Sequence, residues 1–181
     1  MHIEVLSGRH ACVSFDCGNE ELNTFLRHYA RQNSRANLSR TFLLVTGEGP
    51  DILGYFTLAA GALARERFPE AGFPTYPVPV AVLARLAVVR DHQGHGLGEK
   101  LLFAALARVG ESAQGSLPVY AVVVDALTPS VVSFYTRYGF RPLAGDDPLH
   151  LYIPIRQVWN SPLANLSQIG SSHAPKRKLT S

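Results

Sequence analysis

The chain has 181 residues, of which 46% are hydrophobic and 17% charged, which is enough for one hydrophobic core but too short for two full domains. The 17 Lys and Arg residues against 14 Asp and Glu residues leave a formal net charge of +3, which suits an anionic ligand without requiring one. The longest apolar run, residues 78–89, is interrupted by Arg85 well before it could cross a membrane, so we expect no membrane-spanning segment.

Cysteine spacing and the N-terminus narrow the class of protein further. Cys12 and Cys17 match neither a CxxC redox pair nor the spacing of metal ligands. The first ten residues lack the apolar stretch of a signal peptide. We therefore predict a cytoplasmic, reduced protein without a metal site.

The first predicted element is a helix over residues 18–36, which Asn19 is placed to cap. Its apolar residues recur at the i, i+3, i+4, i+7 spacing of a buried stripe: Leu22, Phe25, Leu26 and Tyr29. On a regular helix, three arginines then fall in one row on the opposite face: Arg27, Arg31 and Arg35.

Strands and helices alternate along the rest of the chain. Two β-rich runs predict a hairpin, and the proline-rich residues 65–79 predict a loop. The predicted order is strand 41–46, strand 52–63, strand 80–89, helix 98–110, strand 119–126, helix 129–139 and strand 149–155. This order predicts an α/β (α+β) fold over residues 1–158, and the polar residues 159–181 are expected to form a flexible basic tail.

The segment RDHQGHGLGEKLL, residues 90–102, lies between a predicted strand and a predicted helix and holds glycines at three alternate positions. The free N–H groups of a first helical turn, next to residues without side chains, make an anion-binding site. A dinucleotide fingerprint would need a third glycine at Glu99 or Leu101, and a P-loop would need Lys and Ser or Thr directly after Gly98. Neither motif is present, and a tight turn without a ligand is the alternative.

The spacing Gln93-x-x-Gly96-x-Gly98 after an apolar strand resembles the pyrophosphate loop of the GNAT acyltransferase superfamily. The resemblance implies a central, mixed and mostly antiparallel sheet flanked by helices, in which strands 80–89 and 119–126 splay apart to form the groove for the cosubstrate acetyl-CoA. It also implies two sets of cofactor-binding residues, one on the strand and one on the loop: Leu86, Ala87 and Val88, then Gln93, Gly94, His95, Gly96, Leu97 and Gly98.

The segment SFYTRYGFRPL, residues 133–143, carries the second part of the resemblance. Tyr135 stands where GNAT enzymes often place a tyrosine close to the thioester sulfur, which implies a general acid for the departing coenzyme A thiolate. An ordinary core aromatic is the alternative. Tyr138 is a further aromatic that could share the cleft or pack the helix end. Thr128 replaces the asparagine of many members as the pantetheine contact.

Two catalytic functions have weaker support in the sequence. The family implies that a backbone N–H near Val88 stabilises the transition-state oxyanion. Asp125 and Glu4 are candidate general bases, although no spacing supports either. An acceptor amine of low pKa would need only water as its base.

The match to one branch extends over residues 15–155, which resemble the GNAT toxins of bacterial toxin–antitoxin pairs. These toxins acetylate the α-amine of aminoacyl-tRNA and stop translation. The branch implies a cognate antitoxin of the ribbon–helix–helix type and commonly a homodimer. Independently of the resemblance, the arginine row could follow the tRNA backbone, and other basic residues could extend it: Arg40, Arg90, Lys176, Arg177 and Lys178.

The arginine row has an ordinary alternative, because a charged row is usually a solvated helix face. Three hypotheses for the protein therefore stand. It is an aminoacyl-tRNA acetyltransferase toxin, a housekeeping acetyltransferase for a small amine or a protein N-terminus, or a non-catalytic module that senses CoA or docks a partner.

Overall fold

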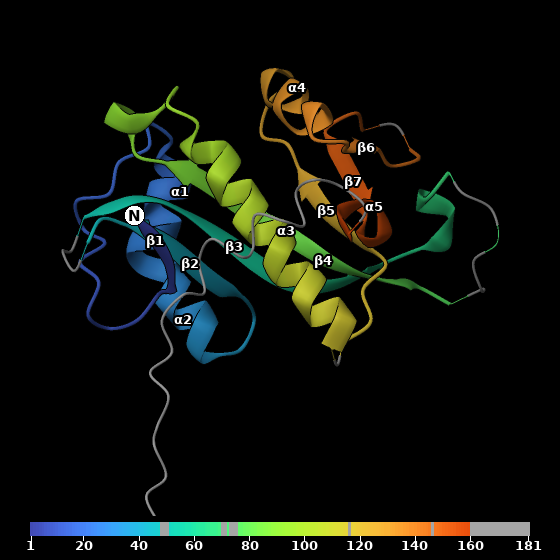
Figure 1. The fold of residues 1–181 in the computed structure, drawn as a ribbon, viewed down its shortest axis with the longest axis horizontal. Coiled ribbons are helices and arrows are strands. Elements are labelled where there is room, and N and C mark those ends of the chain that lie inside the picture. Colours follow the sequence, from blue (N-terminus) through green and yellow to red (C-terminus); the bar gives the residue numbers. More distant parts are fainter. Residues whose placement is uncertain (48–50, 70–71, 73–75, 116, 146, 160–181) are drawn as a thin grey trace, which may run out of the picture.

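The computed structural model describes residues 1–47, 51–69, 72, 76–115, 117–145 and 147–159, and seven strands in this part form one sheet in the order β1-β2-β3-β4-β5-β7-β6 (Figure 1). The strands are β1 (His2–Val5), β2 (Arg40–Val45), β3 (Ile52–Leu63), β4 (Val78–Val88), β5 (Ala121–Asp125), β6 (Arg141–Pro142) and β7 (His150–Pro154). Neighbouring strands are antiparallel except β4 and β5, which are parallel. The predicted fold, with its mixed and mostly antiparallel sheet, is confirmed.

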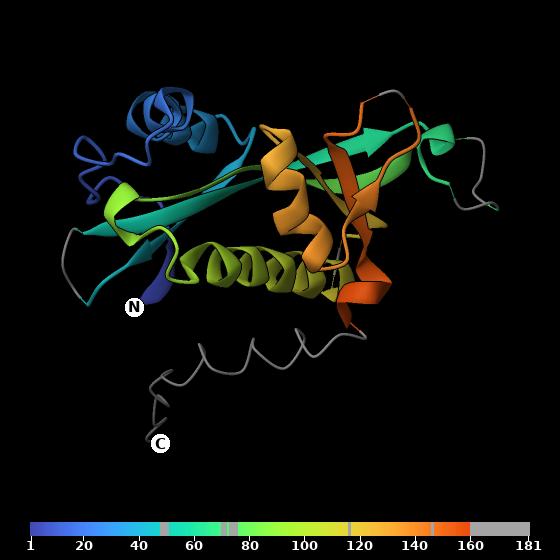
Figure 2. The ribbon, with the colours of Figure 1, turned by 90° about the horizontal axis from the view of Figure 1, so that it is seen from above.

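Helices cover both faces of the sheet, with α1 and α2 on one face and α3 on the other (Figure 2). The α-helices are α1 (Glu20–Thr24), α2 (Ala30–Arg35), α3 (Leu97–Gly115), α4 (Pro129–Arg137) and α5 (Ile155–Trp159), and the other helices are η1 (Phe25–Tyr29), η2 (Arg65–Arg67) and η3 (Arg90–His92). None in the described part of the chain has the length and apolar character that crossing a membrane requires.

Alternation along the strands separates two main cores. Phe42, Leu44 and Phe56 point toward α3 and α4, whereas Leu43 and Tyr55 point toward α1 and η1. Apolar side chains on both faces explain the nearly continuous hydrophobic pattern of β2 and of the first half of β3. The sheet is therefore buried on both sides where β2 and the first half of β3 meet.

The first helix departs from the predicted pattern at its middle. η1 is a π-helix in which the Ala30 N–H donates to the Phe25 carbonyl, five residues earlier, so one residue is inserted into the turn. The buried stripe therefore continues at Ala30, which is 0% exposed, and Tyr29 is 51% exposed. The prediction that Tyr29 is buried is wrong, because the 3.6-residue period does not hold through this turn.

Two irregularities of β4 create the opening that the resemblance implies. In the register with β3, Thr57 pairs with Arg85 and Leu58 pairs with Leu83, so Ala84 is left without a partner in a β-bulge. The pairing of β4 with β5 ends at Val82, although both strands continue. The predicted splay of these two strands is therefore confirmed.

Candidate active site

The loop between β4 and α3 has the backbone conformation of an anion cradle. Gly94 and Gly96 both have φ of +78°, a region that other residues rarely adopt, and an added Cβ at either position would meet no atom within 4 Å. α3 begins directly afterwards at Leu97, so the unpaired N–H groups of its first turn follow the loop in the chain. The conformation fits a pyrophosphate, which must approach the backbone closely.

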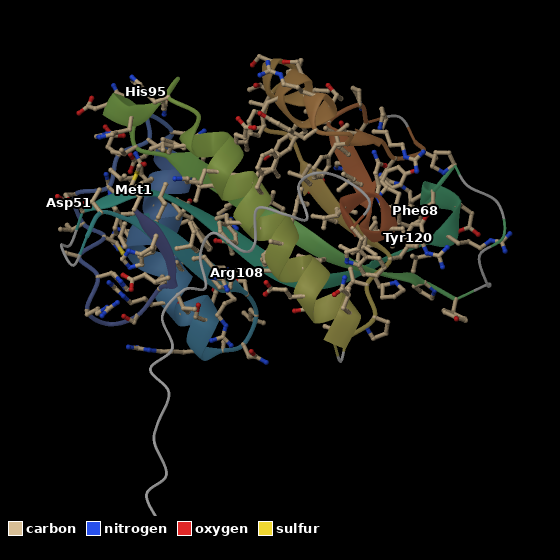
Figure 3. All side chains as sticks on the ribbon, in the orientation of Figure 1. Met1, Asp51, Phe68, His95, Arg108 and Tyr120 are labelled. Carbon is tan, nitrogen blue, oxygen red and sulfur yellow. The ribbon has the colours of Figure 1, made fainter. Side chains whose placement is uncertain are left out.

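The side chains of this loop have different environments. His95 is exposed and projects from the loop (Figure 3), whereas Leu97 is buried and can offer a ligand only its backbone. The Gln93 amide nitrogen donates to the carbonyl oxygens of Cys17 at 2.8 Å and Val88 at 3.0 Å. Gln93 therefore holds the loop against the N-terminal segment, and its contacts are those of a positioning residue.

Arg90 anchors the same loop. Its backbone N–H donates to the Asp16 carbonyl at 2.9 Å, and its guanidinium lies 3.4 Å from the Asp16 carboxylate. The Gly18 N–H, the Asn23 amide and the Arg90 charge together hold the pKa of Asp16 below its usual value. The Arg90 side chain is still 64% exposed, so its role in extending a tRNA-binding surface stays a prediction.

The free edge of β4 runs toward this loop. On its other edge, Leu86, Ala87 and Val88 pair with Phe56, Tyr55 and Gly54 of β3. β3 and β4 approach closely here, because a Cβ on Gly54 would lie 2.7 Å from the Ala87 carbonyl oxygen. Since the pairing of β4 with β5 has already ended at this point, β4 can accept an extended ligand as an added strand, which is the predicted role of residues 86–88.

Tyr135 is buried on α4, with only 5% of its surface exposed, between the rings of Phe134 and Phe140. Burial raises the pKa of its hydroxyl to about 12. Among the described residues no partner hydrogen-bonds this hydroxyl. Tyr135 is thus a core aromatic whose hydroxyl stays protonated near neutral pH.

Phe134 brings α4 into contact with the start of α3. Its Cζ would lie 3.7 Å from a Cβ on Gly98, in the first turn of α3. In the view of Figure 1, the loop after β4 and α4 lie on either side of the first turns of α3. Tyr138 packs against Phe103 and Phe134 at the end of α4, which is the predicted helix-end role. Thr128 precedes α4, and its hydroxyl lies 2.8 Å from that of Ser130.

The two candidate bases lie in different places. Glu4 is on β1, separated from β4 by two strands, and it binds Arg9 and His10, so it is too remote for this role. Asp125 ends β5 near the opening, but its carboxylate lies 3.3 Å from His150. Neither side chain is placed as an unengaged base.

Two of the three arginines in the predicted row are hydrogen-bonded within the protein. Arg27 donates to the Phe15 carbonyl at 2.6 Å, and Arg31 donates to the carbonyls of Ser7 and His10. These bonds fasten residues 7–15 to the helix, along one wall of a cavity of about 510 Å³ that is separate from the glycine loop. Arg35 and Arg40 are exposed. The tail residues Lys176, Arg177 and Lys178 lie outside the described residues.

Sequence reasoning missed Arg85, which it treated only as an interruption of an apolar run. The signal was a charged residue inside an otherwise buried strand. In the structure, Arg85 lies beside the β-bulge, where β4 and β5 separate. Among the described residues no group of three or more His, Cys, Asp or Glu side chains could hold a metal ion.

Comparisons with known proteins agree with this geometry. The model of the acetyltransferase (GNAT) domain matches residues 13–148. A tRNA-acetylating toxin of Mycobacterium tuberculosis (strain ATCC 25618 / H37Rv) is 37% identical over 149 residues, which cover 81% of this chain and 87% of the toxin.

Solved structures of toxins are also similar. AtaT complexed with acetyl-methionyl-tRNAfMet has a TM-score of 0.80 and 29% identity, covering 86% of this chain and 95% of AtaT. A mutant AtaT toxin bound to the C-terminus of the antitoxin AtaR and acetyl-CoA has a TM-score of 0.74 and 28% identity, covering 87% and 95%. Because the family model matches well over half of the chain, the protein belongs to the GNAT family and is an N-acetyltransferase.

Proposed function

We propose that the protein is a toxin that transfers the acetyl group of acetyl-CoA to the α-amine of aminoacyl-tRNA and so blocks translation. The observation that carries this proposal is the 37% identity, over 81% of the chain, with a toxin that acetylates tRNA. The opening between β4 and β5, with the glycine loop and Tyr135 at its end, supplies the chemistry that such a reaction needs.

Different residues of the opening have different roles in acetyl transfer. The N–H groups at Gly94–Gly98 bind the pyrophosphate, and the β4 edge at Leu86–Val88 orients the pantetheine arm. A backbone N–H near Val88 stabilises the oxyanion as the acceptor nitrogen bonds to the acetyl carbon. The Tyr135 hydroxyl gives its proton to the sulfur as the C–S bond breaks, and the proton of the amine passes to water.

The engagement of both candidate bases, Glu4 and Asp125, suits an aminoacyl ester as the acceptor. The α-amine beside an ester is less basic than a free lysine, so a larger share is neutral near pH 7 without help from the protein. Asp125, which ends β5 near the opening, lies beside His150. A housekeeping acetyltransferase that acts on strongly basic amines would benefit more from a positioned base.

The proposal includes a partner and a location. A cognate antitoxin of the ribbon–helix–helix type would hold the toxin inactive, and the structure of AtaT with the C-terminus of AtaR supports such a partner. The protein forms a homodimer in this proposal, and a tRNA substrate places it in the cytoplasm.

The first test is to incubate the purified protein with labelled acetyl-CoA and a pool of charged tRNA, and to count label in the RNA. We expect wild type to label the RNA and Tyr135→Phe to be about 10²- to 10⁴-fold slower with acetyl-CoA binding retained, because only a proton donor is lost. Tyr76→Phe, at an exposed tyrosine outside the site, is the control. No label with wild type, despite acetyl-CoA binding, would redirect the search to small amines and protein N-termini.

A further inference from the structure

Arg85 occupies an unusual position for a charged residue. It lies within β4, between strands β3 and β5, and directly follows Ala84, the bulged residue. Its register partner is Thr57 of β3. The pairing with β5 has ended three residues earlier, at Val82, so Arg85 lies where the sheet opens.

The surroundings of Arg85 leave one of its donors unused. Its guanidinium carbon is 3.8 Å from the centre of the Phe25 ring on η1. Its Nε is buried and has no hydrogen-bond partner among the described residues. Two hydroxyls of β3 on this side of the sheet have hydrogen bonds of their own: the Thr57 hydroxyl pairs with that of Thr41 at 2.9 Å, and the Tyr55 hydroxyl donates to the Leu22 carbonyl at 2.8 Å.

A buried, unpaired donor on a cation is costly, since it has lost water and gained no partner. Such groups in a folded protein call for an explanation, and a ligand that supplies the missing acceptor is one. The stacking on Phe25 holds the guanidinium plane in place. Arg85 is thus held against Phe25, and its Nε–H lacks an acceptor among the described residues.

The side of the sheet indicates which ligand arrives there. Beyond the bulge, Ala87 packs in the core that contains Phe25 and Tyr55, so Arg85 and Ala87 point toward η1. Leu86 and Val88 point to the other face, toward the core that contains Tyr135. Figure 2 shows α1 and α3 on these opposite faces.

The opposite faces separate the two reactants. The glycine loop leads into α3, and Tyr135 is on the α3 face, so coenzyme A occupies that side of the opening. The acceptor amine attacks the same carbonyl carbon from which the thiolate departs, and the side left for its approach is the η1 face. Arg85 is therefore on the acceptor side.

We infer that Arg85 is a positioning residue for the acceptor, whose guanidinium donates to the ester carbonyl oxygen of the aminoacyl group. This inference rests on the proposed function. The carbonyl carbon of an aminoacyl ester is two bonds from the attacking nitrogen, so it is the first oxygen-bearing group of the acceptor beyond the reaction point. A planar guanidinium that binds it fixes the direction of the amine.

The test compares Arg85→Lys and Arg85→Met with wild type in steady-state acetylation of charged tRNA. We expect Arg85→Met to lower kcat/KM for charged tRNA about 10- to 100-fold, since a hydrogen bond to a charged donor is lost. Arg85→Lys keeps the charge without the planar fork and should recover only part of this loss. The KM for acetyl-CoA should stay unchanged in both, which also shows that the variants fold.

Arg108→Lys is the matched control. The Arg108 guanidinium carbon is 4.4 Å from the centre of the Phe42 ring, a contact of the same kind on the α3 face, away from the loop that carries His95 (Figure 3). We expect its kcat/KM for charged tRNA to equal that of wild type. Equal losses in Arg108→Lys and Arg85→Lys would show a general packing effect and overturn the inference.

A second acceptor substrate distinguishes a contact of Arg85 with the ester from a contact with the tRNA backbone. With 3′-aminoacyl adenosine, which has no phosphate, Arg85→Met should show the same fold-loss as with charged tRNA. A loss confined to charged tRNA would assign Arg85 to a phosphate, and a raised KM for acetyl-CoA would assign it to the cofactor; either result overturns the inference. Wild type that acetylates neither acceptor would overturn the proposed function and the inference with it.

Discussion

Replacing Gly96 by alanine tests whether the loop after β4 needs its left-handed backbone to bind acetyl-CoA. Gly96 has φ of +78°, and a Cβ there would meet no atom within 4 Å, so the change adds backbone strain without a clash. Left-handed backbone costs an alanine about 1–2 kcal/mol. In a domain of this size, each kcal/mol lowers Tm by about 2–4 °C. If the loop keeps its shape, the expected loss is therefore about 2–8 °C.

The alternative is that the loop changes shape to relieve the strain, and a measurement of acetyl-CoA binding detects this change. The N–H groups of the loop would then lose their common direction, and one lost hydrogen bond to a charged phosphate weakens binding by about 1.5–3 kcal/mol. This corresponds to a Kd for acetyl-CoA that rises about 10- to 100-fold. We expect a rise in this range, measured by isothermal titration calorimetry beside thermal unfolding.

Gly47→Ala is the matched control for Gly96→Ala. Gly47 has φ of +53°, an added Cβ there also has no neighbour within 4 Å, and the residue follows β2 on the turn toward β3. It should lower Tm by a similar amount and leave the Kd for acetyl-CoA unchanged. Binding as tight as wild type in Gly96→Ala would refute the view that the left-handed backbone of this loop forms the phosphate site.

Two further predictions concern Tyr135 and the π-helix. Since burial raises the pKa of Tyr135 to about 12, its hydroxyl stays protonated through the alkaline range of the assay. Initial rates should therefore rise as the acceptor amine loses its proton, and they should not fall between pH 9 and about pH 10. A fall in rate near the ordinary tyrosine pKa of about 10 would contradict this. Tyr29→Ala should change the free energy of unfolding by less than about 0.5 kcal/mol, whereas Leu26→Ala, at a fully buried position, should cost about 2–5 kcal/mol; equal losses in urea denaturation would contradict the π-helical register.

Local patterns in the sequence were sufficient to predict the order of the main elements and the places of the glycine loop and Tyr135 among them. The apolar runs predicted β2, β3, β4, β5 and β7, and the glycine spacing placed the loop between β4 and α3. The position of Tyr135 before Gly139-Phe140 placed it on α4. These features depend on residues close together in the chain, so their signals survive without knowledge of the fold.

The local sequence pattern did not predict the short elements at the edges of the fold. β1, β6 and α5 are at most five residues long and gain stability from partners elsewhere in the chain. Likewise, the π-turn in the first helix places Ala30 rather than Tyr29 against the sheet. A helical period read from the sequence assumes a regular turn, and packing against the sheet overrides it.

The side-chain partners of the site depended on contacts between distant segments. Arg27 and Arg31 bond carbonyls of residues 7–15, and Gln93 bonds Cys17, 76 positions away. Arg85 acquires its place because the β3–β4 register slips beside it and β5 departs before it. Strand register and the direction of each side chain follow from long-range pairing and packing, so the surroundings of Arg85 could be described only from the assembled sheet.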